Sequence, residues 1–189
     1  PGFLYQQNTM RDALAAGINL NIFNKHCDRV KMANIAQMVN VLQAVILTEG
    51  AKMILTPTYH VFKMYNCHQD AELLDSYVET VDIGLEDEYM VPNLNESVSL
   101  GTDGKIHITM NNLSVDRDYE IEGQLTETEV LEVKGTVLMN EMHAHNTFEQ
   151  PEVVKPKEFD GLPGLLTTGL YLLSACSVLH LEVTVSQAE

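Results

Sequence analysis

The sequence has no tryptophan and few positive charges. Its 189 residues include 11 Lys and Arg against 27 Asp and Glu, which gives a formal net charge of −16. An acidic surface repels nucleic acid and anionic lipid headgroups, because both are negatively charged. We therefore expect no nucleic-acid partner, and a sugar-binding surface would have to do without the largest aromatic ring.

Long apolar runs and a secretion signal are also missing. No stretch approaches the roughly 18 consecutive apolar residues of a membrane span, and the first residues lack the basic and apolar regions of a signal peptide. With 45% apolar residues the chain can still form a packed core. We expect a folded protein with no membrane partner and a cytoplasmic location.

Cysteine is sparse, and its count is odd. Cys27, Cys67 and Cys176 do not form the dense, even set of a secreted disulfide domain, so they favour a reducing compartment. His26 and His68 stand next to two of them, and these four side chains could complete a zinc shell. However, adjacent side chains diverge, and the usual ligand spacing of two to four residues is missing. We expect core thiols instead, with neither metal nor cofactor.

Charge is unevenly distributed along the chain. Residues 1–70 hold six Lys and Arg against four Asp and Glu, whereas residues 71–189 hold five against 23. This change in composition predicts a domain boundary near residue 70.

The first part reads as helix, strand, loop and helix. An apolar stripe at helical spacing predicts a helix over residues 9–25. Residues 30–36 are apolar on both faces, as in a strand of a parallel sheet that helices cover. A second helix is expected after Pro57. A lone strand of this kind can neither pair its edges nor cover its faces, so we expect it to belong to a larger sheet and the chain to be the C-terminal part of a longer protein.

The second part, from about residue 75, shows short alternating runs separated by turns. The stretch TDGKIHITM is a hairpin signal, because Asp103-Gly104 supplies a turn and Ile106, Ile108 and Met110 fall on one face. Several such runs, including YVETVDI, YEIEGQL, EVLEVKGTVLM and CSVLHLEVTV, predict an antiparallel β-sandwich. The fold class is therefore mainly β.

Three stretches also resemble a known family. PGFLYQQNTMRDALAAGINLNIFNKHCDRVKMANIAQMVNVLQAVILT, HAHNTFEQPEVVKP and SACSVLHLEV are similar to the C-terminal region of glycoside hydrolase family 51 α-L-arabinofuranosidases. The resemblance implies that residues 1–70 are the last helix, strand and helix of a (β/α)8 catalytic barrel, with 30–36 as its eighth strand. It implies a jelly-roll-like sandwich over residues 71–189.

The implied activity is retaining, exo-acting removal of terminal arabinofuranosyl groups from oligo- or polysaccharides. In this family two glutamates on earlier barrel strands are the acid/base and the nucleophile, so the resemblance places no catalytic residue in this chain. It does imply one substrate contact, Gln37, where the eighth strand enters its loop. A neutral amide can donate to and accept from sugar hydroxyls. Without the resemblance, an amide that caps the loop backbone is the simpler interpretation. Asn40 is a second candidate.

Two other functions stay open for the sandwich. A carbohydrate-binding module would need exposed aromatic platforms, and the sandwich offers a small set of rings, most of which we expect in the core. These are Tyr77, Tyr89, Tyr119, Phe148, Phe159 and Tyr171. An interaction domain without sugar chemistry would show a large apolar patch on the far side of the sandwich.

Other conspicuous residues have simpler interpretations. His143 and His145 alternate on an expected strand, and we expect a hydrogen-bonded surface pair there. The methionines at positions 32, 38, 53 and 64 are expected to fill the core. DGLPGLLTTGL, residues 160–170, lacks the context of a phosphate loop and is expected to be a turn that enters a strand. Finally, we expect a homo-oligomer, with contacts made by the sandwich.

Overall fold

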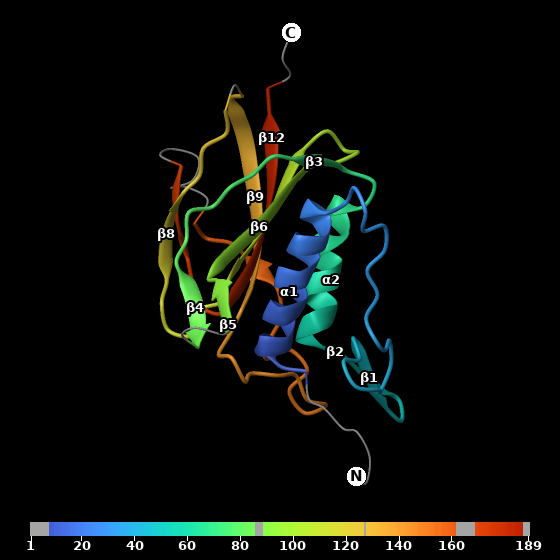
Figure 1. The fold of residues 1–189 in the computed structure, drawn as a ribbon. Coiled ribbons are helices and arrows are strands. Elements are labelled where there is room, and N and C mark those ends of the chain that lie inside the picture. Colours follow the sequence, from blue (N-terminus) through green and yellow to red (C-terminus); the bar gives the residue numbers. More distant parts are fainter. Residues whose placement is uncertain (1–7, 86–88, 127, 162–168, 187–189) are drawn as a thin grey trace.

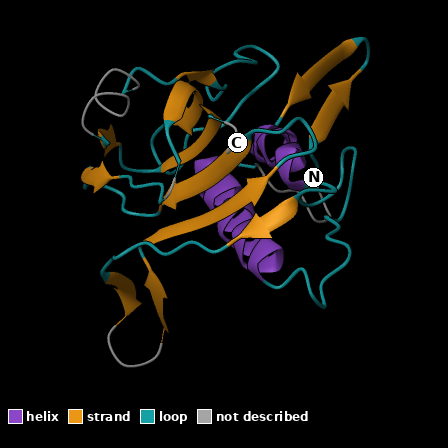
Figure 2. Ribbon diagram, turned by 90° about the horizontal axis from the view of Figure 1, so that it is seen from above, coloured by secondary structure: helices purple, strands orange, loops and turns teal. Residues whose placement is uncertain are grey.

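A computed structural model describes residues 8–85, 89–126, 128–161 and 169–186. The architecture is mainly β, as predicted. A six-stranded antiparallel sheet carries a pair of helices on one face and a strand pair on the other (Figures 1 and 2). The helices are α1 (Met10–Lys25), α2 (Pro57–Tyr65) and a 3₁₀ turn, η1 (Asn66–His68).

The six-stranded sheet is built from strands that are distant in sequence. In spatial order they are β10 (Lys157–Glu158), β9 (Val130–Met139), β12 (Ser177–Val185), β7 (Ile106–Asn112), β6 (Leu94–Leu100) and β3 (Glu72–Leu74). Other described strands form antiparallel pairs: β1 (Ile46–Glu49) with β2 (Lys52–Leu55), β4 (Asp82–Leu85) with β5 (Tyr89–Pro92), and β8 (Tyr119–Glu122) with β11 (Leu170–Leu173).

Alternation along β7 and β12 gives the sheet two different faces. Ile106 and Met110 of β7 point to the same side as Leu179 and Leu181 of β12, where β8 and β11 complete an apolar core. This core includes Ile121, Phe159, Tyr171 and Leu173. The hairpin predicted at Asp103-Gly104 is confirmed: β6 and β7 pair through a turn in which Gly104 has φ 77°.

The opposite face packs against the helices. A second core joins α1 and α2 to β9 and β12; its buried members are Met10, Ala13, Leu14, Val61, Met64, Tyr65, Leu138, Val154, Cys176 and Val178. Both helices were predicted from apolar spacing, and both are confirmed. Neither, nor any other helix in the described ranges, has the length and apolarity needed to cross a membrane.

The strand expected over residues 30–36 is wrong for this structure. This stretch has no regular secondary structure, and the nearby chain makes a single parallel bridge between Val39 and Ile46. Apolar composition alone does not make a strand, because a strand needs a hydrogen-bonded neighbour, and no described strand lies alongside residues 30–36. The run YVETVDI is strand only from Asp82, where β4 finds β5.

Candidate functional site

The segment that carries Gln37 connects α1 to the β1–β2 pair. It runs along the outer side of the helix pair, away from the six-stranded sheet (Figure 1). Its far end is fixed near the start of both helices: the Ala44 carbonyl accepts hydrogen bonds from the Asn8 amide, 2.7 Å, and the Thr56 hydroxyl, 3.0 Å. Gln43 donates to the Asp12 carboxylate at 3.0 Å.

Asp12 holds the first turn of α1 and this segment together. Its carboxylate also accepts from the Thr9 backbone N–H at 2.8 Å and from the Thr9 hydroxyl at 3.0 Å. Burial alone would raise the pKa of Asp12, but the Thr9 N–H and the Gln43 amide stabilise the carboxylate and hold the pKa below its ordinary value. Asp12 therefore acts at the N-terminus of α1.

Gln37 itself lies exposed in this segment. Its side-chain amide makes no hydrogen bond to any residue that the structure describes, so it does not cap the loop backbone here. Asn40 differs, because its amide donates to the Thr48 hydroxyl at 2.8 Å and accepts from the Thr48 N–H at 2.7 Å. Asn40 also adopts a left-handed backbone, φ 58°, which asparagine tolerates better than most residues. Asn40 therefore shapes the loop, whereas the Gln37 amide has no partner among the described residues.

Three methionines, two in this segment and one in β2, are unusually exposed. Met32 is 75% exposed, Met38 68% and Met53 61%. The expectation that these three fill the core is wrong, and of the four methionines named only Met64 is buried. Their predicted burial failed because no described element covers this side of the helix pair.

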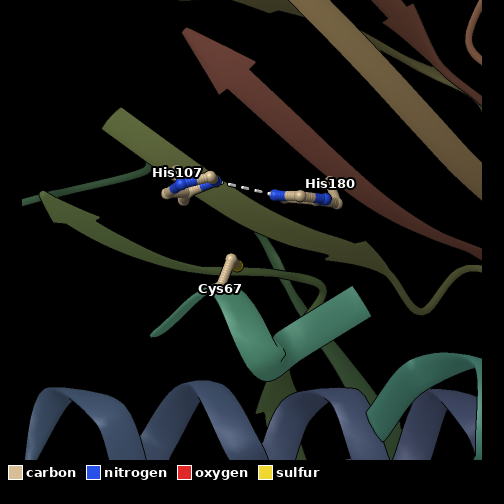
Figure 3. A group of neighbouring side chains, drawn as sticks. All are labelled: Cys67, His107 and His180. Atoms are coloured by element: carbon tan, nitrogen blue, oxygen red, sulfur yellow. Dashed lines mark hydrogen bonds between the residues drawn. The ribbon is translucent and has the colours of Figure 1, made fainter. Parts of the chain in front are cut away.

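A second cluster lies between η1 and the sheet. The Cys67 thiol, His107 and His180 each present a ligand atom, and these atoms lie within 4.8 Å of one another (Figure 3). His107 Nδ1 is 3.1 Å from His180 Nε2, and His107 Nε2 is 3.1 Å from the Asp103 carboxylate. Sequence spacing missed His107 and His180, because they are 73 positions apart in the chain and meet only through the pairing of β7 with β12.

Burial disfavours the charged forms of Cys67 and His180. It raises the pKa of Cys67 to about 12, and nearby Asp103 and Glu182 add to the effect. Burial, followed by the neighbouring His107, lowers the pKa of His180 to about 4. The His68 ring points to the Ser99 hydroxyl, 2.7 Å, and the Thr109 hydroxyl, 2.9 Å. The zinc set considered from the sequence, with His26, Cys27 and His68 around Cys67, is not assembled among the described residues.

The aromatic rings of the sandwich do not form a sugar-stacking platform. Tyr77 is 86% exposed and Tyr89 68%, whereas Phe159 and Tyr171 are buried in the core and pack edge to face. The three exposed rings required of a binding module are therefore not available within the set that the sequence offered.

Two remaining expectations concern histidines and glycines. His143 lies in a turn and His145 makes an isolated bridge to Thr9, so the strand expected there is wrong. The carbonyls of Ala144 and Met142 accept hydrogen bonds from the first N–H groups of α1. Most of residues 160–170 lie outside the described ranges, although Leu170 does begin β11.

Comparison with known proteins connects this fold to one family. Residues 1–172 match the family described as alpha-L-arabinofuranosidase C-terminal domain. The intracellular exo-alpha-L-arabinofuranosidase of Bacteroides ovatus is 43% identical over 183 residues, which cover 96% of this chain and 36% of that protein. The crystal structure of the GH51 arabinofuranosidase from Xanthomonas axonopodis pv. citri is 40% identical with TM-score 0.88, over 97% of this chain and 37% of that one.

A more distant structure shares the fold alone. The Thermotoga maritima alpha-L-arabinofuranosidase is 24% identical with TM-score 0.75, over 94% of this chain and 39% of that one. The chain thus spans a little over a third of the length of these relatives. By the family match and the two closer likenesses, the chain belongs to the C-terminal domain family of glycoside hydrolase family 51 α-L-arabinofuranosidases.

Proposed function

We propose that the chain is the C-terminal part of a retaining, exo-acting α-L-arabinofuranosidase. The observation that carries the proposal is the 43% identity, over 183 residues, to an enzyme of which the chain spans 36%. In this proposal residues 1–70 complete a (β/α)8 barrel, and residues 71–189 form a jelly-roll-like sandwich that braces it.

The exposed segment around Gln37 supports this arrangement. Met32 and Met38 of this segment and Met53 of β2 expose most of their apolar side chains, and exposed apolar surface is typical of an interface when it is contiguous. Neighbouring barrel strands would cover it and would give residues 30–36 the hydrogen-bonded partners that a strand requires. The irregular conformation of 30–36 is then the form that the segment takes without those partners.

The proposed chemistry uses two carboxylates outside this chain. One protonates the leaving oxygen while the other, roughly 5 Å away, attacks the anomeric carbon; water then hydrolyses the glycosyl-enzyme. Gln37 contributes binding, because an unpaired amide near the carboxyl end of a barrel strand can donate to and accept from ring hydroxyls. The substrate class is an oligo- or polysaccharide with terminal arabinofuranosyl groups, as in arabinan degradation.

Location and assembly belong to the same proposal. The Bacteroides ovatus and Streptomyces lividans relatives are named as intracellular enzymes, which supports an intracellular location for this protein. A homo-oligomer is part of the proposal, and sedimentation of the restored full-length protein would test it.

Activity assays test the enzymatic part. We expect the chain alone not to hydrolyse 4-nitrophenyl α-L-arabinofuranoside, and we expect activity once the barrel of the full-length protein is restored. Activity in the isolated chain would contradict the proposal, because it would require a catalytic carboxylate pair within these residues.

Gln37 can be tested in the restored enzyme. We expect Gln37→Ala to lower kcat/KM by about 10- to 100-fold, as the loss of one or two sugar hydrogen bonds of roughly 1.4 to 2.7 kcal/mol would do. Gln150→Ala, which changes an exposed glutamine far along the chain, is the matched control. Equal activity of the two variants would remove Gln37 from the binding site.

The binding-module function is the second candidate. Tyr77 and Tyr89 are exposed, but two rings on separate segments give little stacking surface. Retention of the isolated chain on an arabinan column, lost in Tyr77→Ala, would favour this candidate over the first.

A further inference from the structure

The Cys67, His107 and His180 cluster is not used by the proposed function. Its members come from three elements that meet at the helix side of the sheet: Cys67 from η1, His107 from β7 and His180 from β12. Figure 3 shows the Cys67 side chain pointing from η1 toward the two imidazoles.

Strand register places the two histidines on one face. β7 and β12 are antiparallel neighbours in which His180 lies opposite Thr109 and Glu182 lies opposite His107. Residues two apart on a strand share a face, so His107 and His180 are diagonal neighbours there. The intervening Ile108 and Leu181 point into the sandwich core. The convergence is therefore fixed by the sheet and does not depend on a loop.

Asp103 sets the tautomer of His107. Its carboxylate, 3.1 Å from Nε2, can only accept, so Nε2 carries the hydrogen and Nδ1 presents a lone pair. A carboxylate behind a ligand histidine in this way is the usual outer-shell arrangement of metal sites. Gly101 makes room for it, because a Cβ at that position would lie 2.6 Å from the Asp103 carboxylate and 2.8 Å from the His107 ring.

The distances match those around a single ion. His107 Nδ1 and His180 Nε2 are 3.1 Å apart, and two nitrogens bound to one tetrahedral zinc ion lie about 3.3 Å apart. The Cys67 sulfur lies within 4.8 Å of a ligand nitrogen of each histidine. Asp103 adds negative charge behind His107, which favours a cation, whereas the nearby Glu182 is already paired with Lys105 at 2.6 Å.

We propose that Cys67 Sγ, His107 Nδ1 and His180 Nε2 bind a zinc ion, with water as the fourth ligand. On binding, the thiol releases its proton to solvent and becomes a thiolate. In the metal-free cluster, His180 Nε2 carries the hydrogen that it donates to His107 Nδ1. On binding, His180 Nε2 loses this hydrogen and His180 Nδ1 gains one, so the ring stays neutral. Three bonds to protein atoms replace three of the ion's water ligands. The inference is independent of glycosidase activity.

Such an ion would fasten the helix pair to the sheet. Cys67 follows α2 directly, whereas β7 and β12 are the central strands. The ion would therefore join elements that otherwise meet through side-chain packing and through the hydrogen bonds of His68 and Tyr65. The competing explanation is a metal-free cluster in which the Cys67 thiol donates to the Met64 carbonyl at 3.3 Å and the imidazoles bond to each other.

Cobalt(II) titration of the purified chain distinguishes the two. Cobalt takes the geometry of zinc and absorbs light when a thiolate binds it. We expect a thiolate-to-metal charge-transfer band that saturates at one equivalent, intense visible bands of a four-coordinate site, and loss of both signals when zinc is added. Absence of the charge-transfer band would overturn the proposal.

Variants assign the ligands. We expect Cys67→Ser to abolish the charge-transfer band and Asp103→Asn to weaken cobalt binding by 10- to 100-fold, as loss of an outer-shell carboxylate does. Cys27→Ser, which removes an exposed thiol outside the cluster, should keep the band. A band that survives in Cys67→Ser would overturn the assignment.

If circular dichroism shows that Cys67→Ser is unfolded, alkylation of the wild-type chain decides: zinc must protect Cys67 and leave Cys27 reactive.

Discussion

Gly17 shows how closely α1 approaches the sheet. A Cβ at this position would lie 2.4 Å from the Asn111 Oδ1 atom of β7. Asn111 cannot move freely, because its amide donates to the buried Tyr65 hydroxyl at 3.1 Å. A glycine in mid-helix is otherwise unfavourable, so packing against the sheet decides the residue here.

We expect Gly17→Ala to lower the free energy of unfolding by about 1 to 2 kcal/mol. The clash outweighs the gain of about 1 kcal/mol in helix propensity. Denaturant unfolding followed by circular dichroism measures the change. Asn19→Ala, on the exposed side of the same helix, is the control and should be neutral or stabilising. A Gly17→Ala variant as stable as the wild type would mean that α1 sits further from β7.

At the residue scale, the sequence predicts local features such as helices and turns better than it predicts which distant residues come together. Helix spacing and the Asp103-Gly104 turn could be read directly, because they depend on neighbours within a few residues. His107 and His180 carried no such signal, since only the register of β7 against β12 brings them together. Gln37 was found only through resemblance to a family.

At the element scale, α1 is held to β6 by an ion pair at its last turn. The Lys25 ammonium bonds the Glu96 carboxylate, which also accepts from the Ser76 hydroxyl at 3.0 Å. The Glu96 side chain is 5% exposed and that of Lys25 34%. A buried carboxylate that loses its cation is costly.

We expect Lys25→Met to lower the free energy of unfolding by about 2 kcal/mol, because Glu96 stays buried without its cation. Adding Glu96→Gln should recover part of this loss. Lys155→Met breaks the exposed pair with Glu152, whose side chains are 48% and 69% exposed, and should cost no more than about 0.5 kcal/mol. Thermal unfolding of all variants at low salt gives the comparison. Equal losses in Lys25→Met and Lys155→Met would show that burial of Glu96 contributes nothing.

The main strands of the six-stranded sheet were predicted well. The pair β1–β2 falls in a stretch that was expected to be a loop, and the strand expected over residues 30–36 did not form. The hairpin β6–β7 and the strands β9 and β12 have antiparallel partners here, so alternation was a sufficient signal. Residues 30–36 have the composition of a buried parallel strand but no described partner. The composition of a segment indicates whether it can be buried. Its conformation also depends on which neighbouring strands and helices are present.

At the scale of the whole molecule, most acidic groups are exposed, whereas His68 and His180 are partly buried. Burial, followed by the neighbouring histidines, lowers the pKa of His68 to about 4, and burial and His107 do the same for His180. In the unfolded chain both titrate near 6.5. Between pH 6.5 and 4 the unfolded state therefore binds more protons than the folded state, and stability must fall as the pH falls.

We expect the free energy of unfolding, measured with chelator present, to be insensitive to these histidines above pH 7. Between pH 6.5 and 4 it should drop by about 2.5 kcal/mol for each of the two histidines, or about 5 kcal/mol together. Asp12 and Glu182, whose pKa values are lowered, lose their contributions only at more acidic pH, so they do not account for a drop in this window. His68→Gln keeps a donor and an acceptor for Ser99 and Thr109 but cannot titrate, and it should flatten the profile. A drop of the same size in His68→Gln and in the wild type would show that His68 does not contribute to the acid sensitivity and that its site tolerates a charged imidazole.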